Sequence, residues 1–214
     1  ENVSHVFTYR VPEGMEVKPG MRVLDLCAAP GGKSTQIADH LAGKGVLVTN
    51  EIHPARARIL LENIERMGVT NAIVTNEDTA RLAAAMPGQF DRVLVDAPCS
   101  GLGVMTDKPD LKYRVTDESI ESLKAEQKKI LDACSSYVKV GGLLVYSTCS
   151  ILPEENEKQV EEFLLNHPEF KPDEGDAWVL EKLKPRFRNG MLALLPCRDG
   201  VEGFFIARMR RVSL

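Results

Sequence analysis

The chain has 214 residues, 43% of them hydrophobic, which suits one α/β domain with a substantial core. Its formal net charge of -4 gives no overall attraction for nucleic acid, so any such binding has to use local basic patches or another domain. No apolar run approaches the roughly 18 residues of a membrane span, and the first ten residues lack the order of a signal peptide. We therefore expect a soluble cytoplasmic protein without a membrane partner.

The cysteines are odd in number, five in all, and none forms a C-x-x-C pair. This pattern argues against both a disulfide framework and a zinc ribbon, so we expect reduced thiols and no metal site. The cysteines are Cys27, Cys99, Cys134, Cys149 and Cys197.

Residues 1–20 combine proline, glycine and charged residues, and we expect an irregular lead-in that ends in a turn at Pro19-Gly20. Residues 22–35 then read as a buried parallel strand, a turn of small residues and the start of a helix that continues to Leu41. The small residues at 28–32 let the backbone approach a bound molecule, and the first amides of the helix face it. A nucleotide-like ligand is the expected occupant.

The turn does not match the usual phosphate-binding patterns. Gly32-Lys33-Ser34 resembles the end of a P-loop, but Cys27 stands where that pattern needs its first glycine. The Rossmann fingerprint fails as well, because its first glycines are replaced by cysteine and alanine. A P-loop-like ATPase stays open as an alternative, supported by an acidic strand end at Asp96.

Acidic residues follow the next two predicted strands. Glu51 comes directly after the strand at 46–50, about 20 residues after the glycine turn, where nucleotide-binding α/β folds commonly place an acid that accepts hydrogen bonds from ribose. The alternative is a solvated loop carboxylate. Asp78 follows the strand at 72–76, and it either meets the adenine edge of a ligand or caps the next helix, at 81–86.

Between these two strands, Pro54 opens a predicted helix that ends at Met67. Ile59, Leu60, Ile64 and Met67 recur at helical spacing along it. We expect all four in the core.

Thiols follow the fourth and fifth predicted strands. The strand at 90–96 ends in Asp96 and then Cys99, and the strand at 143–147, which Gly141-Gly142 separates from the preceding chain, ends near Cys149. A long helix at 117–137 lies between them, with Thr116 or Asp117 as its cap, and Cys134 falls on its apolar side. We expect Cys134 to pack in the core rather than take part in chemistry.

The last part of the chain predicts a helix at 153–166 and then two strands, at 191–195 and 203–209, joined by a turn at Asp199-Gly200. The alternation of strands and helices predicts a mostly parallel three-layered α/β sheet closed by this hairpin. Such sheets bind ligands outside the carboxyl ends of their strands.

The two thiols are expected to meet in one cleft if the fourth and fifth strands are neighbours, about 4.8 Å apart. Two thiols and Asp96 beside a nucleoside site indicate covalent catalysis, because a thiolate adds readily to an electron-poor ring carbon at neutral pH. The alternatives for Cys99 and Cys149 are small core residues, a metal pair and a redox pair. Nothing nearby supplies the further ligands that a closed metal site needs.

Three motifs together resemble the NOL1/NOP2/Sun family of S-adenosylmethionine-dependent RNA cytosine-5 methyltransferases, with the bacterial 16S rRNA enzymes as the most similar members. The motifs are Asp25-Leu-Cys-Ala-Ala-Pro-Gly-Gly-Lys33, Asp96-Ala-Pro-Cys-Ser100, and Ser147-Thr-Cys-Ser150 followed by Glu154-Glu-Asn156. The similarity runs from about Arg22 to the end of the chain and includes Gly203-Phe-Phe-Ile206.

The resemblance implies a Rossmann-like class I methyltransferase fold, with a seven-stranded mostly parallel sheet and helices on both faces, in a catalytic domain over residues 21–214. It implies that Cys149 attacks C6 of the target cytosine, that Cys99 assists removal of the C5 proton, and that Asp96 hydrogen-bonds N3 of the base. The residues that would hold S-adenosylmethionine are Cys27, Ala28, Ala29, Pro30, Gly31, Gly32, Lys33, Glu51, Asp78 and Asp96.

The implied substrate is RNA, with rRNA before tRNA, and a catalytically silent RNA-binding protein is a further alternative. This chain departs from its relatives after the Ser-Gly-x-Gly loop, where Lys108 alone stands in a segment that is often more basic. We also expect no separate RNA-binding domain before the catalytic one. The candidate phosphate contacts are Lys108, Lys112, Arg114, Arg186, Arg188 and Arg198.

Overall fold

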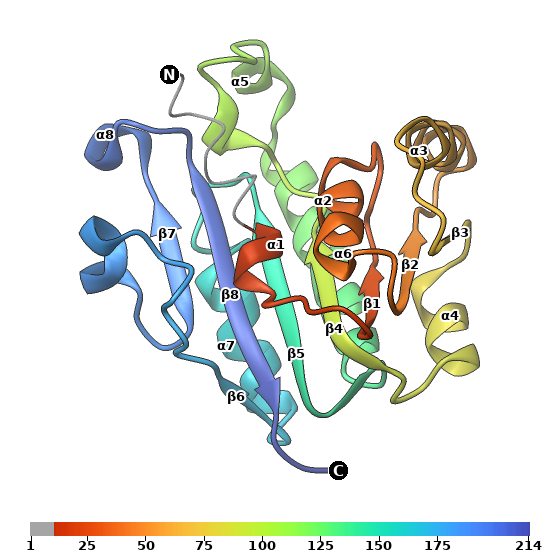
Figure 1. Cartoon of the computed structure of the whole chain (residues 1–214). Helices are drawn as coiled ribbons and strands as arrows, with labels where there is room; N and C mark the ends of the chain where they lie inside the picture. Colours follow the sequence, from red (N-terminus) through yellow and green to blue (C-terminus); the bar gives the residue numbers. More distant parts are fainter. Residues whose placement is uncertain (1–10) are drawn as a thin grey trace.

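A computed structural model describes residues 11–214, which form an eight-stranded sheet with helices on both faces (Figure 1). The strand order is β3-β2-β1-β4-β5-β8-β6, and β7 pairs with β8 outside this path. The strands are β1 (Arg22–Asp25), β2 (Val46–Asn50), β3 (Ala72–Thr75), β4 (Phe90–Asp96), β5 (Val138–Thr148), β6 (Phe170–Pro172), β7 (Met191–Leu194) and β8 (Phe204–Arg211).

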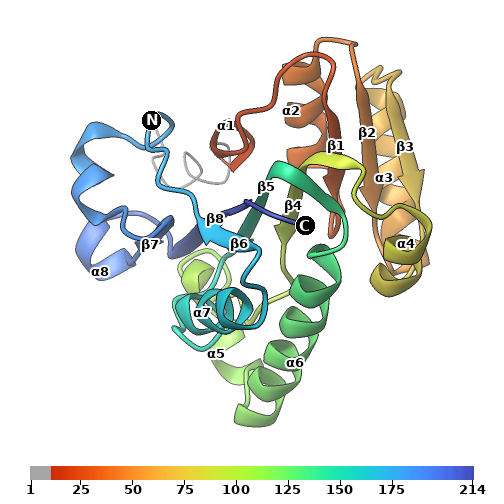
Figure 2. The same ribbon diagram turned by 90° about the horizontal axis from the view of Figure 1, so that it is seen from below.

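The helices cover both faces of this sheet. Helices α1, α2 and α3 lie on one face, and α4, α6 and α7 lie on the other (Figures 1 and 2). The helices are α1 (Val11–Gly14), α2 (Gly32–Leu41), α3 (Pro54–Arg66), α4 (Thr79–Ala85), α5 (Leu111–Arg114), α6 (Asp117–Cys134), α7 (Glu157–Asn166) and α8 (Pro196–Asp199), with 3-10 turns η3 (Leu102–Val104) and η4 (Glu181–Arg186).

Each face of the sheet has its own apolar core. Successive side chains of a strand point to opposite faces, so Val23 of β1 packs with Ile37 of α2, whereas its neighbour Leu24 packs with Ile130 of α6 and Phe163 of α7. These side chains are buried, which explains why the parallel strands read as continuous apolar runs.

The predicted fold class is confirmed. The five strands β3, β2, β1, β4 and β5 are parallel to their neighbours, and β8 is antiparallel to β5, β6 and β7. The expected hairpin is the β7–β8 pair, although its connection contains α8 before Gly200. Strand β6 was not expected, because three residues that end in proline carry no readable alternation; with it the sheet has eight strands rather than seven.

The predicted break at Gly141-Gly142 is wrong, because β5 continues through both glycines. The β4–β5 register shifts between Phe90 and Arg92, so the glycines mark an irregularity inside the strand. A Cβ atom on Gly142 would lie only 3.1 Å from the Phe90 carbonyl oxygen. It would also lie 2.8 Å from Val138 Cγ1 and 2.9 Å from the Lys139 carbonyl oxygen within β5 itself, so the local conformation of the strand requires glycine at this position.

Two of the four expected core residues of α3 are exposed. Leu60 and Ile64 are buried, but Ile59 is 47% exposed and Met67 is 56% exposed. Ile59 is rotated about 100° from Leu60 on a helix of 3.6 residues per turn, which carries it off the buried stripe. Met67 is the C-cap residue, where the chain leaves the helix.

The lead-in is not irregular throughout. Residues 1–10 of the predicted segment lie outside the described part of the chain, and Val11–Gly14 form a helical turn. Val11 and Met15 are fully buried in the same core as Ile37 and Leu41 of α2, so apolar packing orders this turn. The turn at Pro19-Gly20 is confirmed.

Helix α7 begins at Glu157 rather than Pro153, because Asn156 has non-helical backbone angles. The Asn156 side chain accepts a hydrogen bond from Thr148 Oγ1 (2.5 Å) and donates one to the Ser150 carbonyl oxygen (2.9 Å).

Helix α6 ends at Cys134, earlier than expected, and Thr116 caps its start. Across residues 11–214, no helix combines the length and apolar character needed to cross a membrane.

Candidate active site

A cavity of about 670 Å³ opens at the carboxyl ends of β1, β2, β4 and β5, with α6 as one wall. The ends of parallel strands meet at one edge of a sheet, so residues far apart in the sequence converge there. The cavity is lined by seven of the predicted site residues: Cys27, Ala29, Glu51, Asp78, Asp96, Cys99 and Cys149.

The other predicted residues of the glycine turn are not among those that line the cavity. Ala28 packs with Leu60 and Ile64 under the turn. Gly31 has a φ of +110°, and a Cβ atom there would lie 3.0 Å from a Leu60 methyl group. The Pro30 carbonyl oxygen accepts a hydrogen bond from Asn63 (2.8 Å). These contacts shape the turn, and Gly32 opens helix α2 behind it.

Glu51 is only 2% exposed, so the alternative of a solvated loop carboxylate is wrong. One carboxylate oxygen accepts a hydrogen bond from the His53 amide (3.0 Å), and the other lies 3.3 Å from Arg56 Nη1. Arg56 also donates to the Ala29 carbonyl oxygen (2.9 Å), which links the β2 end to the glycine turn. Glu51 is therefore held at the cavity wall by both neighbouring segments.

Asp78 caps helix α4, accepting hydrogen bonds from the amides of Ala80 (2.9 Å) and Arg81 (3.3 Å). It also lines the cavity, so the two interpretations from the sequence do not exclude each other. A contact between Asp78 and an adenine edge stays a prediction.

Asp96 joins three elements at the edge of the cavity. Its carboxylate lies 2.7 Å from Lys33 Nζ at the start of α2 and accepts a 2.7 Å hydrogen bond from Ser147 Oγ. Ser147 is the residue opposite Asp96 in the β4–β5 ladder, so strand register sets this contact. Burial lowers the pKa of Lys33, but the charge and hydrogen bond of Asp96 outweigh it and raise the pKa above its ordinary value. Lys33 is therefore a cation beside the thiols.

The expected proximity of Cys99 and Cys149 is confirmed, with the two sulfur atoms 3.3 Å apart. The hydrogen bond from Cys99 lowers the pKa of Cys149 below its ordinary value; Lys33 acts in the same direction, and burial and Asp96 oppose it. That hydrogen bond, together with burial, raises the pKa of Cys99. Cys149 is therefore the more acidic thiol of the pair.

The remaining buried thiols are set apart from this pair. Burial raises the pKa of Cys27, which lines the cavity, and of Cys134, which is fully buried in the core as expected. Across residues 11–214, no group of three or more His, Cys, Asp or Glu side chains has an arrangement that could hold a metal ion.

Several residues that build the site were not predicted. Asn50, which lines the cavity, donates to the Glu77 carbonyl oxygen (3.0 Å) and accepts from Thr75 Oγ1 (2.9 Å); its place at the end of a predicted strand was the available signal. Glu126 and Lys129 line the cavity from α6, and no sequence signal shows which face of that helix meets a ligand.

The candidate phosphate contacts differ in their surroundings. Arg186 and Arg198 both pair with Asp199, near the β7–β8 connection. Lys112 lies over the ring of Tyr113 on α5, with Nζ 4.8 Å from the ring centre. Figure 1 shows α5 at the end of the sheet where β4 and β5 finish. The α5 segment therefore lies at the same end of the sheet as the thiols.

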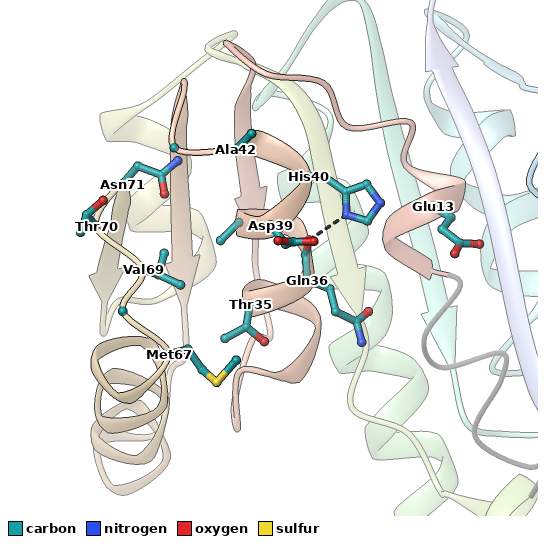
Figure 3. A pocket seen from close by; sticks show the side chains of 13 residues that line it. Glu13, Thr35, Gln36, Asp39, His40, Ala42, Met67, Val69, Thr70 and Asn71 are labelled. Atoms are coloured by element: carbon teal, nitrogen blue, oxygen red, sulfur yellow. Dashed lines mark hydrogen bonds between the residues drawn. The ribbon is translucent and has the colours of Figure 1, made fainter.

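A second cavity, of about 580 Å³, lies beside α2 and the chain that follows α3 (Figure 3). Glu13 and His40 lie at one side of it, and Thr70 and Asn71 lie at the other. None of the predicted site residues lines this cavity. It is therefore separate from the thiol site.

The comparisons with known proteins agree on one family. A family model described as 16S rRNA methyltransferase RsmB/F matches residues 14–210. The chain is 39% identical over 203 residues to a probable ribosomal RNA small subunit methyltransferase B of Bacillus subtilis, covering 94% of this chain and 45% of the relative. It is 40% identical over 199 residues to a ribosomal RNA small subunit methyltransferase F of Vibrio campbellii, covering 89% and 40%.

Among solved structures, NSun6 from Pyrococcus horikoshii with SFG matches at a TM-score of 0.84 and 31% identity, covering 100% of this chain and 53% of that one. The chain thus spans less than half the length of the two curated relatives.

Proposed function

Because the chain belongs to the 16S rRNA methyltransferase RsmB/F family, we propose that its cavity transfers a methyl group from S-adenosylmethionine to C5 of a cytosine in RNA. The observation that carries the proposal is the pair of sulfur atoms, 3.3 Å apart, at the wall of a cavity large enough for a nucleoside. Family membership argues against the P-loop-like ATPase. It also favours 16S rRNA over tRNA as the substrate.

The residues around the cavity fit S-adenosylmethionine. Its volume of about 670 Å³ lies within the usual range for small-molecule sites, about 300–1,000 Å³. The carboxylate of Glu51 is buried and directed to the cavity, which suits ribose hydroxyls, and Asp78 lies further along the same wall. When bound, this cofactor supplies an electrophilic methyl group.

Cys149 is the nucleophile of the proposed reaction. Cytosine C5 is too weak a nucleophile by itself, and addition of a thiolate to C6 breaks the C5–C6 double bond and moves electron density to C5 and N3. The lowered pKa of Cys149 favours formation of this thiolate. The C5 carbon would then form a bond to the methyl carbon of S-adenosylmethionine, with the methyl–sulfonium bond breaking and S-adenosylhomocysteine as the leaving group.

Asp96 and Lys33 stabilise the adduct. N3 becomes basic when the bond to sulfur forms, and it takes up a proton from solvent beside the Asp96 carboxylate, which Lys33 pairs at 2.7 Å. The protonated N3 then donates a hydrogen bond to the Asp96 carboxylate. Ser147 fixes the other carboxylate oxygen, so the orientation of Asp96 does not depend on substrate.

Cys99 completes the cycle. Once Cys149 is a thioether, its sulfur no longer accepts the hydrogen bond that holds the proton on Cys99, so Cys99 loses this proton to water. The Cys99 thiolate then takes the C5 proton. The electrons of that C–H bond restore the C5–C6 double bond. The C6–sulfur bond breaks, and its electrons return to Cys149 as a thiolate. N3 gives up its proton to solvent.

The test is transfer of a labelled methyl group from S-adenosylmethionine to small ribosomal subunits or 16S rRNA, with analysis of the product nucleoside. Wild-type protein is expected to form 5-methylcytidine, and Cys149→Ser is expected to lose about 10⁴-fold in rate, as other nucleophile replacements do. Cys197→Ser makes the same chemical change at an exposed cysteine and is the matched control. A Cys149→Ser protein as active as this control would overturn the mechanism.

Calorimetry separates the remaining alternatives. We expect the protein to bind S-adenosylmethionine and Glu51→Gln to bind it more weakly. Binding of ATP-Mg²⁺ without binding of S-adenosylmethionine would favour the ATPase. Binding of cofactor and RNA without turnover in the wild type would favour a catalytically silent RNA-binding protein. Methyl transfer to tRNA but not to 16S rRNA would identify tRNA as the substrate.

A further inference from the structure

A carboxylate that the proposed mechanism does not use lies between the two cysteine loops. Glu155 is 0% exposed and belongs to the turn that precedes α7. Its neighbour Glu154 is partly exposed, with 39% of its side chain accessible, and pairs with Lys158 at 2.7 Å. The two adjacent glutamates therefore have opposite surroundings, and only Glu155 faces the interior.

Glu155 accepts hydrogen bonds from three separate segments. One oxygen accepts from the Ser100 amide (2.8 Å) and from Gln127 Nε2 on α6 (3.1 Å). The other oxygen accepts from the hydroxyls of Ser100 (2.5 Å) and Ser150. Within residues 11–214, no lysine or arginine forms an ion pair with this carboxylate, so hydrogen bonds alone compensate for its burial.

The serines that Glu155 holds are next to the thiols in the chain. Ser100 follows Cys99 and Ser150 follows Cys149, and the two serine hydroxyls lie 3.1 Å apart. A displacement of either serine therefore moves the adjacent sulfur. Backbone hydrogen bonds also link the two segments, from the Gly103 amide to the Cys149 carbonyl oxygen (2.9 Å) and from the Ala97 amide to the Ser147 carbonyl oxygen (2.9 Å), whereas Glu155 links them through side chains.

We propose that Glu155 is a positioning residue that sets the distance between the Cys99 and Cys149 sulfurs by joining their loops through Ser100 and Ser150. The catalytic consequence rests on the proposed function, whereas the geometric one does not. If the two sulfurs move apart, Cys149 loses the hydrogen bond that lowers its pKa, and Cys99 is no longer placed to take the C5 proton. A misplacement of about 1 Å at a reacting group costs on the order of 10²-fold in rate.

Glu155→Gln tests this with little change in size. The amide has one acceptor oxygen and one NH₂ group, so it cannot accept from the Ser100 amide and from all the other donors at once. Glu154→Gln makes the same change one position earlier, on a partly exposed side chain, and is the matched control. Ser150→Ala is a milder second variant that removes one donor and leaves the carboxylate in place.

The first readout needs neither RNA nor cofactor. Diamide oxidises adjacent thiols to a disulfide, and mass spectrometry of the full chain measures the rate at which Cys99 and Cys149 become linked. We expect this rate to fall about tenfold in Glu155→Gln, less in Ser150→Ala, and not at all in Glu154→Gln. Unchanged linkage in both Glu155→Gln and Ser150→Ala would overturn the proposal.

The second readout is steady-state methyl transfer. We expect kcat of Glu155→Gln to fall by about 10²-fold with little change in KM for S-adenosylmethionine, because the cofactor wall of the cavity is untouched. Equal kcat in Glu155→Gln and wild type would refute the inference and leave the proposed function standing. Absence of transfer in the wild type would refute the proposed function, and the diamide rates would still decide the role of Glu155.

If Glu155→Gln does not fold, as judged by its thermal unfolding, Ser150→Ala decides both readouts. A slower linkage and a lower kcat in Ser150→Ala support the proposal. Rates equal to those of the wild type contradict it.

Discussion

The hydrogen bond between Cys99 and Cys149 joins two thiols whose pKa values are displaced in opposite directions. Cys27 lies in the same cavity, and burial is the main reason that its pKa is raised. Cys149, the proposed nucleophile, is thus distinguished from the other cysteines of the cavity by the hydrogen bond to Cys99 and by the charge of Lys33. A cysteine motif in a sequence does not contain this information.

Replacing Cys99 by alanine is expected to raise the pKa of Cys149, because the variant lacks the donor that lowers it. In the wild type, alkylation of Cys149 by iodoacetamide should reach half its maximal rate below pH 9.0, the ordinary value for this thiol, and in Cys99→Ala the midpoint should move upward. Peptide mass spectrometry across pH measures both, with the exposed Cys197 as internal reference. Superimposable Cys149 profiles would contradict this account of the pair.

Asp25 is a second residue whose surroundings change its chemistry. Burial raises its pKa to about 7, although a 2.6 Å hydrogen bond from Ser34 Oγ opposes the change. Its other carboxylate oxygen is buried without a hydrogen-bond partner. Between about pH 4 and pH 7, the folded chain therefore holds a proton that the unfolded chain has lost.

Stability should accordingly decrease as pH rises through this window, and Asp25→Asn should remove this part of the pH dependence. We expect the destabilisation caused by Asp25→Asn to be smaller at pH 8 than at pH 5, by up to about 2.6 kcal/mol, because about two pKa units of this window lie between the two pH values at 1.36 kcal/mol per unit. Urea unfolding of both proteins at the two pH values measures the difference. An equal cost of the substitution at pH 5 and pH 8 would show that Asp25 has an ordinary pKa.

Among the elements, α3 shows what periodicity can and cannot predict. Its start at Pro54 and the burial of Leu60 and Ile64 follow from the sequence. The exposure of Ile59 and Met67 does not, because an apolar residue next to a buried stripe looks the same in the sequence as one inside it. The second cavity includes Met67, which shows that this end of α3 faces an open surface.

Because Leu60 is buried and Ile59 is half-exposed, truncating these two neighbouring side chains of α3 should reduce the free energy of unfolding by different amounts. Leu60→Ala removes a fully buried side chain and is expected to destabilise the protein by about 2–5 kcal/mol, whereas Ile59→Ala, at a half-exposed position, is expected to cost about 1 kcal/mol or less. Denaturant unfolding of the two variants at one pH measures both values. Similar losses would mean that Ile59 is part of the core.

The sequence predicts the ends of the strands more fully than the strand register and the hydrogen bonds that hold the loops after them. The bounds of β2 and β4 and the adjacency of β4 and β5 follow from apolar runs and the usual strand order. The continuation of β5 through its glycines could not be predicted, because the register shift depends on β4. The role of Glu155 was equally hidden, since its four donors come from loops and a helix that meet only in the folded chain.

In the whole molecule, the sheet brings distant motifs to one edge. Lys33, Asp96 and Cys149 belong to three separate motifs, yet Lys33 and Asp96 form an ion pair (2.7 Å) and the charges of both act on Cys149 at the ends of β1, β4 and β5. The motifs predicted this convergence, and the strand order explains it. The RNA surface is less defined, because the net charge is negative and the chain spans less than half the length of its curated relatives.

The account depends most on a covalent bond between Cys149 and cytosine C6, so the direct measurement is the isolation of that adduct. Cys99→Ala, which lacks the base that releases the product, is incubated with 16S rRNA and S-adenosylmethionine, denatured, digested and mapped by mass spectrometry. We predict a nucleotide attached to the peptide that contains Cys149 and no adduct in the Cys99→Ala/Cys149→Ser double variant. A nucleotide on any other residue, or the absence of an adduct when the wild type methylates the same RNA, would contradict the account.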